Sequence, residues 1–438
     1  MKTLRFAIVT VAMLGSVSAF ATNARVESMG KNSAFIRDDI TIFDNPANIN
    51  LYPNFLIGEL GVYTNSSSIG TGENHDPWDP WFGGLFSLDI GAGKSLSIGG
   101  IFGRKEERLF KYFPDKIAKS YNNSLPDIET PIPVTNFDGF LGADFDGTAF
   151  GLHIYIAHQD GIANNGNITE DAFVSAAQLD AGVNIEISDD FQLEFAGGAA
   201  RIQYGPSDHD LIDGKLISVF ANARMFSRIE AINGNLIPAA SFRNMNAPGR
   251  DEFDVSAGLG VDTKFDRGFF WLGLTGFYNV QNAGSNWYLM LDNDNNPFTR
   301  FYDIGDDGWG KGKTRLWQLG GTISFGIERN IWWPWFVLRV GGQKTIAYAD
   351  YKAGDPQYTS NNILCPSKGK GDCRENGNYF VTNPINDGTR NDNVGFGFGI
   401  NVEEKLKIDA TVSEDLLFRN PFQGGGRLLS RISATYSF

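Results

Sequence analysis

The last twelve residues of the chain, RLLSRISATYSF, alternate between apolar and polar side chains up to the terminal carboxylate. One face of this stretch carries Leu428, Ile432, Ala434, Tyr436 and Phe438, and the other carries Arg431, Ser433, Thr435 and Ser437. Successive side chains of a β-strand point to opposite faces, so this period of two residues predicts a strand with one apolar face. Both a soluble sheet and a membrane barrel can end in such a strand.

The rest of the chain separates these alternatives through the lengths of its connections. Stretches of roughly ten residues with strand character are joined in turn by tight turns and by long polar segments, the pattern of a transmembrane antiparallel β-barrel. Tight turns are predicted at 91–94, 146–147, 188–190, 266–268, 329–334 and 404–405, and long outer loops at 65–80, 105–136, 160–173, 205–215, 282–313, 350–392 and 415–426. The strands then number sixteen and both termini are periplasmic. The pair between Leu216 and Arg243 has the least regular pattern and is open to being loop instead.

The first 21 residues predict a secretory signal peptide. Lys2 and Arg5 precede the apolar run 6–14, and Ala19 and Ala21 supply the small residues before a cleavage site after position 21. The run is shorter than the roughly 20 residues that a membrane-spanning helix needs, so a retained anchor is disfavoured. The mature chain is therefore expected to leave the cytoplasm.

An exported chain whose last strand ends in Tyr-x-Phe resembles the β-barrels of the bacterial outer membrane. The resemblance assigns Tyr436 and Phe438 to the C-terminal signal that the barrel-assembly machinery reads, and it makes outer-membrane lipid and this machinery the expected partners. The formal net charge of −14 argues against nucleic acid as a partner.

The two cysteines of the chain, Cys365 and Cys373, lie in CPSKGKGDC within the predicted loop 350–392. Disulfides form and persist outside the cytoplasm, so export favours a disulfide between these two residues over two free thiols.

Catalytic and metal sites have little support. No Gly-x-Ser-x-Gly motif occurs, and His153 and His158 are five residues apart on one strand and so face opposite sides. The loop DNDNNPFTRFYDIGDDG spaces oxygen ligands two residues apart at Asp292, Asp294 and Asn296, as a Ca²⁺ site can, but it lacks the glycine and the final glutamate of an EF-hand. A solvated acidic loop is the favoured interpretation. The sequence predicts no enzyme and no cofactor.

Residues 22–53 form the least ordinary segment of the chain. Pro46 and Pro53 exclude a regular helix or a central strand, whereas Ile40, Ile42 and Phe43 are too apolar for a solvated tail. We therefore expect a signal peptide at 1–21, a plug in the barrel lumen at 22–53, and an outer-membrane barrel with long extracellular loops at 54–438. In this plug Phe43 packs against the barrel wall.

The stretch NARVESMGKNSAFIRDDITIFDNPANI resembles the N-terminus of the FadL-type outer-membrane transporters and of the related PorV-like proteins of type IX secretion. The positions that carry the resemblance are Arg25, Met29, Gly30, Ala34, Asp39, Phe43, Asn45, Pro46 and Ala47. It implies a barrel of fourteen strands, against the sixteen counted above. It also implies a plug, with Phe43, Asn45, Pro46 and Ala47 as its gate.

Two functions follow from this resemblance. The first is a FadL-like channel for passive uptake of hydrophobic small molecules past a movable plug. The second is a PorV-like surface protein that docks secreted proteins or other partners, and a structural outer-membrane protein with a fixed plug is also open. An apolar lumenal pocket would favour the channel, and a polar, collapsed lumen beneath ordered loops would favour docking.

Overall fold

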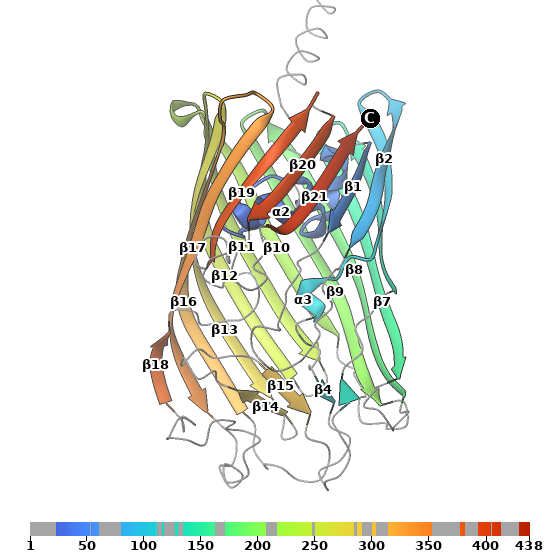
Figure 1. The fold of residues 1–438 in the computed structure, drawn as a ribbon, viewed down its shortest axis with the longest axis vertical. Coiled ribbons are helices and arrows are strands. Elements are labelled where there is room, and N and C mark those ends of the chain that lie inside the picture. The colour runs from blue at the N-terminus through green and yellow to red at the C-terminus, as the bar shows by residue number, and fades with distance from the viewer. Residues whose placement is uncertain are drawn as a thin grey trace, which may run out of the picture.

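The computed structural model of the chain is drawn in Figure 1. It describes residues 23–52, 54–60, 80–110, 112, 116–117, 128–129, 135–162, 171–206, 217–247, 250–283, 287–290, 300–303, 314–352, 377–381, 393–403, 405–412 and 429–438.

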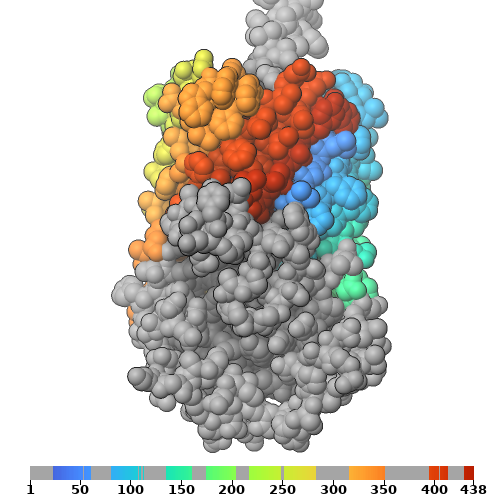
Figure 2. Space-filling view, viewed as in Figure 1, coloured from blue at the N-terminus to red at the C-terminus, as the bar shows by residue number. Residues whose placement is uncertain are grey.

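These residues form a closed antiparallel barrel of sixteen strands, in which the last strand pairs with the first. The strands are β1 (Phe55–Leu60), β2 (Trp81–Gly91), β3 (Lys94–Phe102), β6 (Thr135–Phe145), β7 (Thr148–Ile162), β8 (Asp171–Ser188), β9 (Phe191–Pro206), β10 (Ser218–Ile229), β11 (Gly234–Ala247), β12 (Arg250–Phe265), β13 (Gly268–Ala283), β16 (Thr314–Asn330), β17 (Phe336–Lys352), β19 (Asn393–Val402), β20 (Leu406–Val412) and β21 (Leu429–Ser437). Figure 2 shows the two ends of the sheet side by side, with β21 in red next to β1 in blue.

Four short strands form a separate small sheet, and a fifth extends the barrel wall. The small sheet contains β4 (Lys116–Ile117), β5 (Ile128–Glu129), β14 (Trp287–Met290) and β15 (Arg300–Asp303). The fifth, β18 (Gly377–Val381), pairs with the outer half of β17, whereas β19 pairs with its inner half. We therefore count β18 and β19 as one position in the barrel.

The fourteen strands expected from the resemblance are wrong for this chain, and the alternative of sixteen, counted from the sequence pattern, is confirmed. The uncertain pair between Leu216 and Arg243 is a regular hairpin, β10–β11, closed by the short helix η6 (Glu230–Ile232). The predicted turns also lie where expected. At Asp146-Gly147 both residues have positive φ, 51° and 92°, the conformation of a two-residue turn whose twist matches its strands.

The two faces of the barrel wall differ sharply in polarity. On β7 the outward side chains of Leu152, Ile154 and Ile156 are 46–52% exposed, whereas His153 and Tyr155 between them are fully buried. The same alternation runs along β13, where Leu272 and Leu274 point outward. An apolar exterior around a polar interior reverses the order of a water-soluble sheet, and it is stable where the exterior meets lipid.

The closing strand follows the predicted alternation. Tyr436 and Phe438 are 42% and 53% exposed, while Ser433 and Thr435 are buried in the barrel. Among the described residues, no helix is long and apolar enough to cross a membrane.

Residues 23–52, called the N-terminal segment below, lie inside the barrel near the end that carries the short turns (Figure 1). The segment is broken into α2 (Asn23–Ser28), η1 (Ser33–Phe35), η2 (Asp39–Phe43) and η3 (Pro46–Leu51). Helix α2 contacts β17 and β19–β21, η1 contacts β11–β13, and η3 contacts β3 and β6–β8. The segment thus reaches the wall on several sides of the lumen.

A second piece of chain enters the lumen after β3. Residues 103–112, called the loop segment below, include the short helix α3 (Glu107–Phe110) and bury the side chains of Leu109 and Tyr112. The sequence placed most of this stretch in an outer loop, because its run of charged residues is typical of solvated surface. The charges are instead paired inside the barrel, as described next.

Candidate lumenal binding cavity

The Asn-Pro-Ala turn is held against the wall by its own hydrogen bonds. The Asn45 side chain caps η3 by accepting a bond from the Ala47 N–H (3.0 Å), and Pro46 occupies the first helical position. The Asn45 amide also donates to Asn184 on β8 (2.7 Å), and Asn184 donates in turn to Asn48 (2.8 Å). All these groups are buried, so each needs the partner that the others supply.

Glycines on the inner face of the wall let the backbone of the N-terminal segment lie directly on the strands. A Cβ at Gly341 would lie 2.5 Å from Cα of Met29, and one at Gly258 would lie 2.9 Å from the Phe35 ring. The wall glycines that face the segment in this way are Gly142, Gly151, Gly182, Gly258, Gly260, Gly273, Gly326, Gly341, Gly395 and Gly397. A Cβ at any of these positions would lie within 3.0 Å of an atom of the N-terminal segment, so part of the segment would have to shift.

Arg25 links α2 to Asp38 in the same segment and to β16 of the barrel wall. Its guanidinium lies 2.8 Å from Asp38 and 2.7 Å from Glu328 of β16, and Glu328 also receives Arg339 (3.0 Å). Burial by itself lowers the pKa of Arg25, but the neighbouring carboxylates outweigh it and raise the pKa above its usual value. The arginine therefore stays charged and links the two structures.

The two lumen segments meet at Phe43. Arg104 of the loop segment lies 3.7 Å from the centroid of the Phe43 ring, and Arg108 donates to the Phe43 carbonyl (2.8 Å). Both arginines also bind Glu106. Burial alone would raise the pKa of the Glu106 carboxyl, but Arg108 and Arg104 outweigh it and hold that pKa below its usual range.

His153 of β7 extends this network to the neighbouring strands β6 and β8. One ring nitrogen lies 2.7 Å from Asp180 and the other 2.8 Å from Asp138, which also binds Arg104. The imidazole stacks on Phe140 with centroids 4.5 Å apart. Because both nitrogens face carboxylate oxygens, a doubly protonated ring satisfies both hydrogen bonds. Within the described residues, no three His, Cys, Asp or Glu side chains are placed to hold a metal ion.

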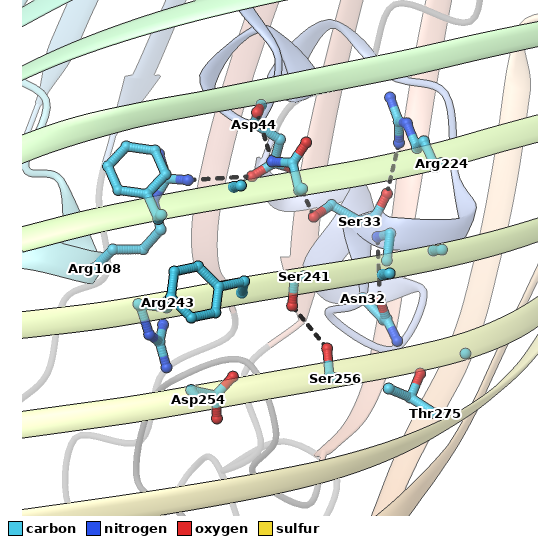
Figure 3. Close-up of a pocket in the computed structure, with 18 of the residues that line it drawn as sticks. Asn32, Ser33, Asp44, Arg108, Arg224, Ser241, Arg243, Asp254, Ser256 and Thr275 are labelled. Carbon is cyan, nitrogen blue, oxygen red and sulfur yellow. Dashed lines mark hydrogen bonds and ion pairs between the residues drawn. The ribbon is translucent and has the colours of Figure 1, made fainter.

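A cavity of about 230 Å³ lies beside the N-terminal segment (Figure 3). Most of its wall comes from β10–β13, from residues 31–35 and 44–45, and from Arg108 and Leu109 of the loop segment. Strands β8, β16 and β17 each add one polar side chain, Gln178, Thr322 and Gln343. Figure 3 shows Arg108 and Arg243 toward one end of the cavity and Asn32 and Ser33 toward the other. The hydrogen-bonded pair Ser241 and Ser256 (2.7 Å) lies between these ends.

The cavity combines apolar walls with compensated charges. Phe35, Leu109, Phe220 and Met245 contribute apolar side chains, and Ala239 leaves space between them. The arginines that line the cavity are paired from behind with carboxylates outside the lining. These pairs are Arg108 with Glu106, Arg224 with Glu194, and Arg243 with Glu252. Lys31, Asp44 and Asp254 also line the cavity, so polar and charged groups interrupt its apolar surface. Because the arginines are already paired with carboxylates, the arrangement favours an uncharged guest over an anion.

The structure brings some of the predicted site residues together and leaves others aside. Asn45 lines the cavity, and Phe43 of the N-terminal segment contacts Arg104 and Arg108 of the loop segment. Tyr436 and Phe438 lie at the outer surface, away from the lumen. Cys365 and Cys373, and the weak calcium candidates Asp292, Asp294 and Asn296, lie outside the described residues.

Sequence reasoning missed the arginines of the loop segment and the wall glycines. The charge run RKEER at 104–108 gave no sign of burial, because charged runs are usually solvated. Glycine was abundant, at 52 residues, but the sequence does not say which glycines face a packed backbone.

A scan against protein families finds no match for this sequence, and a search of curated proteins finds none either. Among solved structures, CdiB from Escherichia coli is similar with a TM-score of 0.41 and 10% identity, and the match covers 88% of this chain but only 63% of CdiB. The toluene transporter TodX of Pseudomonas putida matches with a TM-score of 0.34 and 10% identity, over 95% of this chain and 97% of TodX. A FadL homologue of Pseudomonas aeruginosa matches with a TM-score of 0.36 and 13% identity, over 95% of this chain and 98% of its own.

Proposed function

We propose that this protein is a channel of the bacterial outer membrane for passive uptake of small hydrophobic molecules. The observation that carries the proposal is the cavity inside the barrel, bounded by apolar side chains and by arginines whose charges are already paired. The apolar exterior of the wall supports the location in a membrane.

The size of the cavity limits the class of guest. At about 230 Å³ it falls below the roughly 300–1,000 Å³ of pockets for drug-sized ligands. It exceeds the roughly 150 Å³ of an engineered apolar cavity that binds benzene. A molecule with one ring or a short aliphatic chain therefore fits this space.

In this proposal the N-terminal segment is the plug of the channel. It occupies the lumen between the cavity and the end with the short turns, and the loop segment approaches from the other side. Passage then depends on a local movement of one of these pieces, because both are packed against the wall or against each other.

Uptake of toluene by sealed vesicles that contain the purified protein tests the proposal. Ser256→Phe fills the cavity and should remove most of the uptake, whereas Val255→Phe adds the same side chain on the outward face and should leave it unchanged. Uptake by both variants at the wild-type rate would place the route elsewhere. If the wild-type protein gave no uptake above that of empty vesicles, the channel would be rejected in favour of a docking or structural role.

A further inference from the structure

We propose that residues 31–34 are the gate of this channel and that the Asn-Pro-Ala turn is a fixed anchor. Guests leave the cavity between residues 31–34 and strands β10–β11. This inference rests on the proposed channel function, and it names the part of the N-terminal segment that moves.

The Asn-Pro-Ala turn has no room to move along the wall. Gly151 and Gly182 lie so close to Asn45 and Pro46 that a Cβ on either glycine would overlap them. A buried hydrogen bond from Asn45 to Asn184, and another from Asn184 to Asn48, hold the turn from the side. Displacing the turn would leave several buried polar groups without partners at once.

The residues on either side of 31–34 are fixed in the same manner. Met29 lies with its backbone against Gly326 and Gly341, and the Phe35 ring fills the space above Gly258 and its neighbours. Both side chains belong to one buried apolar cluster that also contains Trp271. A movement between these two points is therefore confined to about four residues.

Within residues 31–34, Asn32 and Ser33 are held by polar contacts, whereas Ala34 packs on the apolar cluster. Arg224 of β10 donates to the Ser33 carbonyl (3.2 Å), and the Ser33 hydroxyl donates to Asp44 (2.8 Å). Asn32 donates to Ser324 of β16 (3.1 Å). The four side chains are half-buried, so water can replace these bonds without a large rearrangement of the wall.

The cavity lies on this side of the N-terminal segment. Residues 31–35 and strands β10–β11 both line it, and η1 lies next to β11. Strand β10 contains no glycine, and the one glycine of β11, Gly234, lies against Asp262 and Thr263 of β12. Here the segment therefore meets side chains such as Arg224, whereas at β7, β8 and β17 it lies against glycines.

Two cross-links distinguish a local gate from movement of the whole segment. One joins Ala34→Cys of the gate to Ala239→Cys of β11, two positions that pack on the same apolar cluster. The other joins Asn50→Cys of η3 to Ser97→Cys of β3 next to the anchor, two residues that lie outside the cavity lining. Both are made in a chain with Cys365→Ser and Cys373→Ser, and each is closed by oxidation or by a short bismaleimide. Mass spectrometry confirms each bridge, and heat-dependent gel mobility confirms the folded barrel.

The measurement is toluene uptake by vesicles before and after each bridge is closed. The gate bridge should lower uptake by about tenfold or more and the anchor bridge by less than about twofold. Reduction of a disulfide bridge should restore uptake. Equal loss with both bridges would mean that the whole segment moves, and no loss with the gate bridge would mean that guests leave elsewhere. Either result overturns the gate while the channel stands, whereas no uptake before cross-linking rejects the channel itself.

Discussion

Substitution of one wall glycine should loosen the N-terminal segment without touching that segment's sequence. Gly151 of β7 faces the backbone of Pro46 and Ala47 so closely that the Cβ of an alanine would overlap it. The wall strand is held by its two neighbours through a continuous ladder, so the turn has to give way. When the Asn-Pro-Ala turn moves away from β7, the buried hydrogen bond from Asn45 to Asn184 breaks.

The cost of Gly151→Ala follows from these contacts. Overpacking of a filled interior costs about 1–3 kcal/mol, and a buried polar group left without its partner costs a further 1–3 kcal/mol or so. Alanine also lowers the conformational entropy of the unfolded chain, which stabilises the folded state by about 0.4–1 kcal/mol. The free energy of unfolding should therefore fall by about 1–6 kcal/mol.

Urea unfolding of the protein in lipid vesicles measures this change. Gly276→Ala is the matched control, because a Cβ at this outward position of β13 meets nothing closer than 3.9 Å. Its unfolding midpoint should equal or exceed that of the wild type, while the midpoint of Gly151→Ala falls. Limited trypsin digestion should also cut the N-terminal segment faster only in Gly151→Ala. Identical midpoints and digestion rates in the two variants would refute the argument that the wall glycines hold the segment.

Three further predictions concern charge and covalent links. Arg25→Ala leaves the buried Asp38 without its cation and should cost about 3–5 kcal/mol in urea unfolding. Because two arginines lower the pKa of Glu106, wild type should be more stable than Glu106→Gln above the usual carboxyl pKa of about 4.3, and acid should erase this difference as the pH falls through the lowered pKa. Intact mass after alkylation without reductant should show Cys365 and Cys373 unmodified, and two added alkyl groups would exclude their disulfide.

The barrel could be predicted from the sequence because its signals are local. A period of two residues indicates each strand, and turn sequences such as Asp146-Gly147 indicate where the chain reverses direction. The least regular hairpin, β10–β11, is rich in alanine and contains Pro238, so its pattern was weak although its pairing is regular. The strand number implied by the resemblance failed because a likeness confined to the N-terminus does not fix the size of the barrel.

The cavity could not be predicted in the same way. Its walls join residues 31–45 with strands some two hundred residues later, and only the register of the closed barrel brings them together. Alternation identified polar, inward positions such as Ser433 and Thr435 of the last strand, but it could not predict which residues the polar side chains inside the barrel bind. The pairing of Arg108 with the N-terminal segment likewise depends on a loop that returns into the lumen, for which the sequence carries no local signal.

The contacts of the N-terminal segment also constrain the order in which the protein assembles. This segment is synthesised before every strand, yet helix α2 contacts β19, β20 and β21, which are made last. Its complete binding surface exists only once β21 has paired with β1 and closed the barrel. Contacts so distant in sequence form slowly. The segment must therefore stay unfolded until closure or be enclosed as the last strands join, so residues 23–52 are among the last to reach their native positions although they precede every strand.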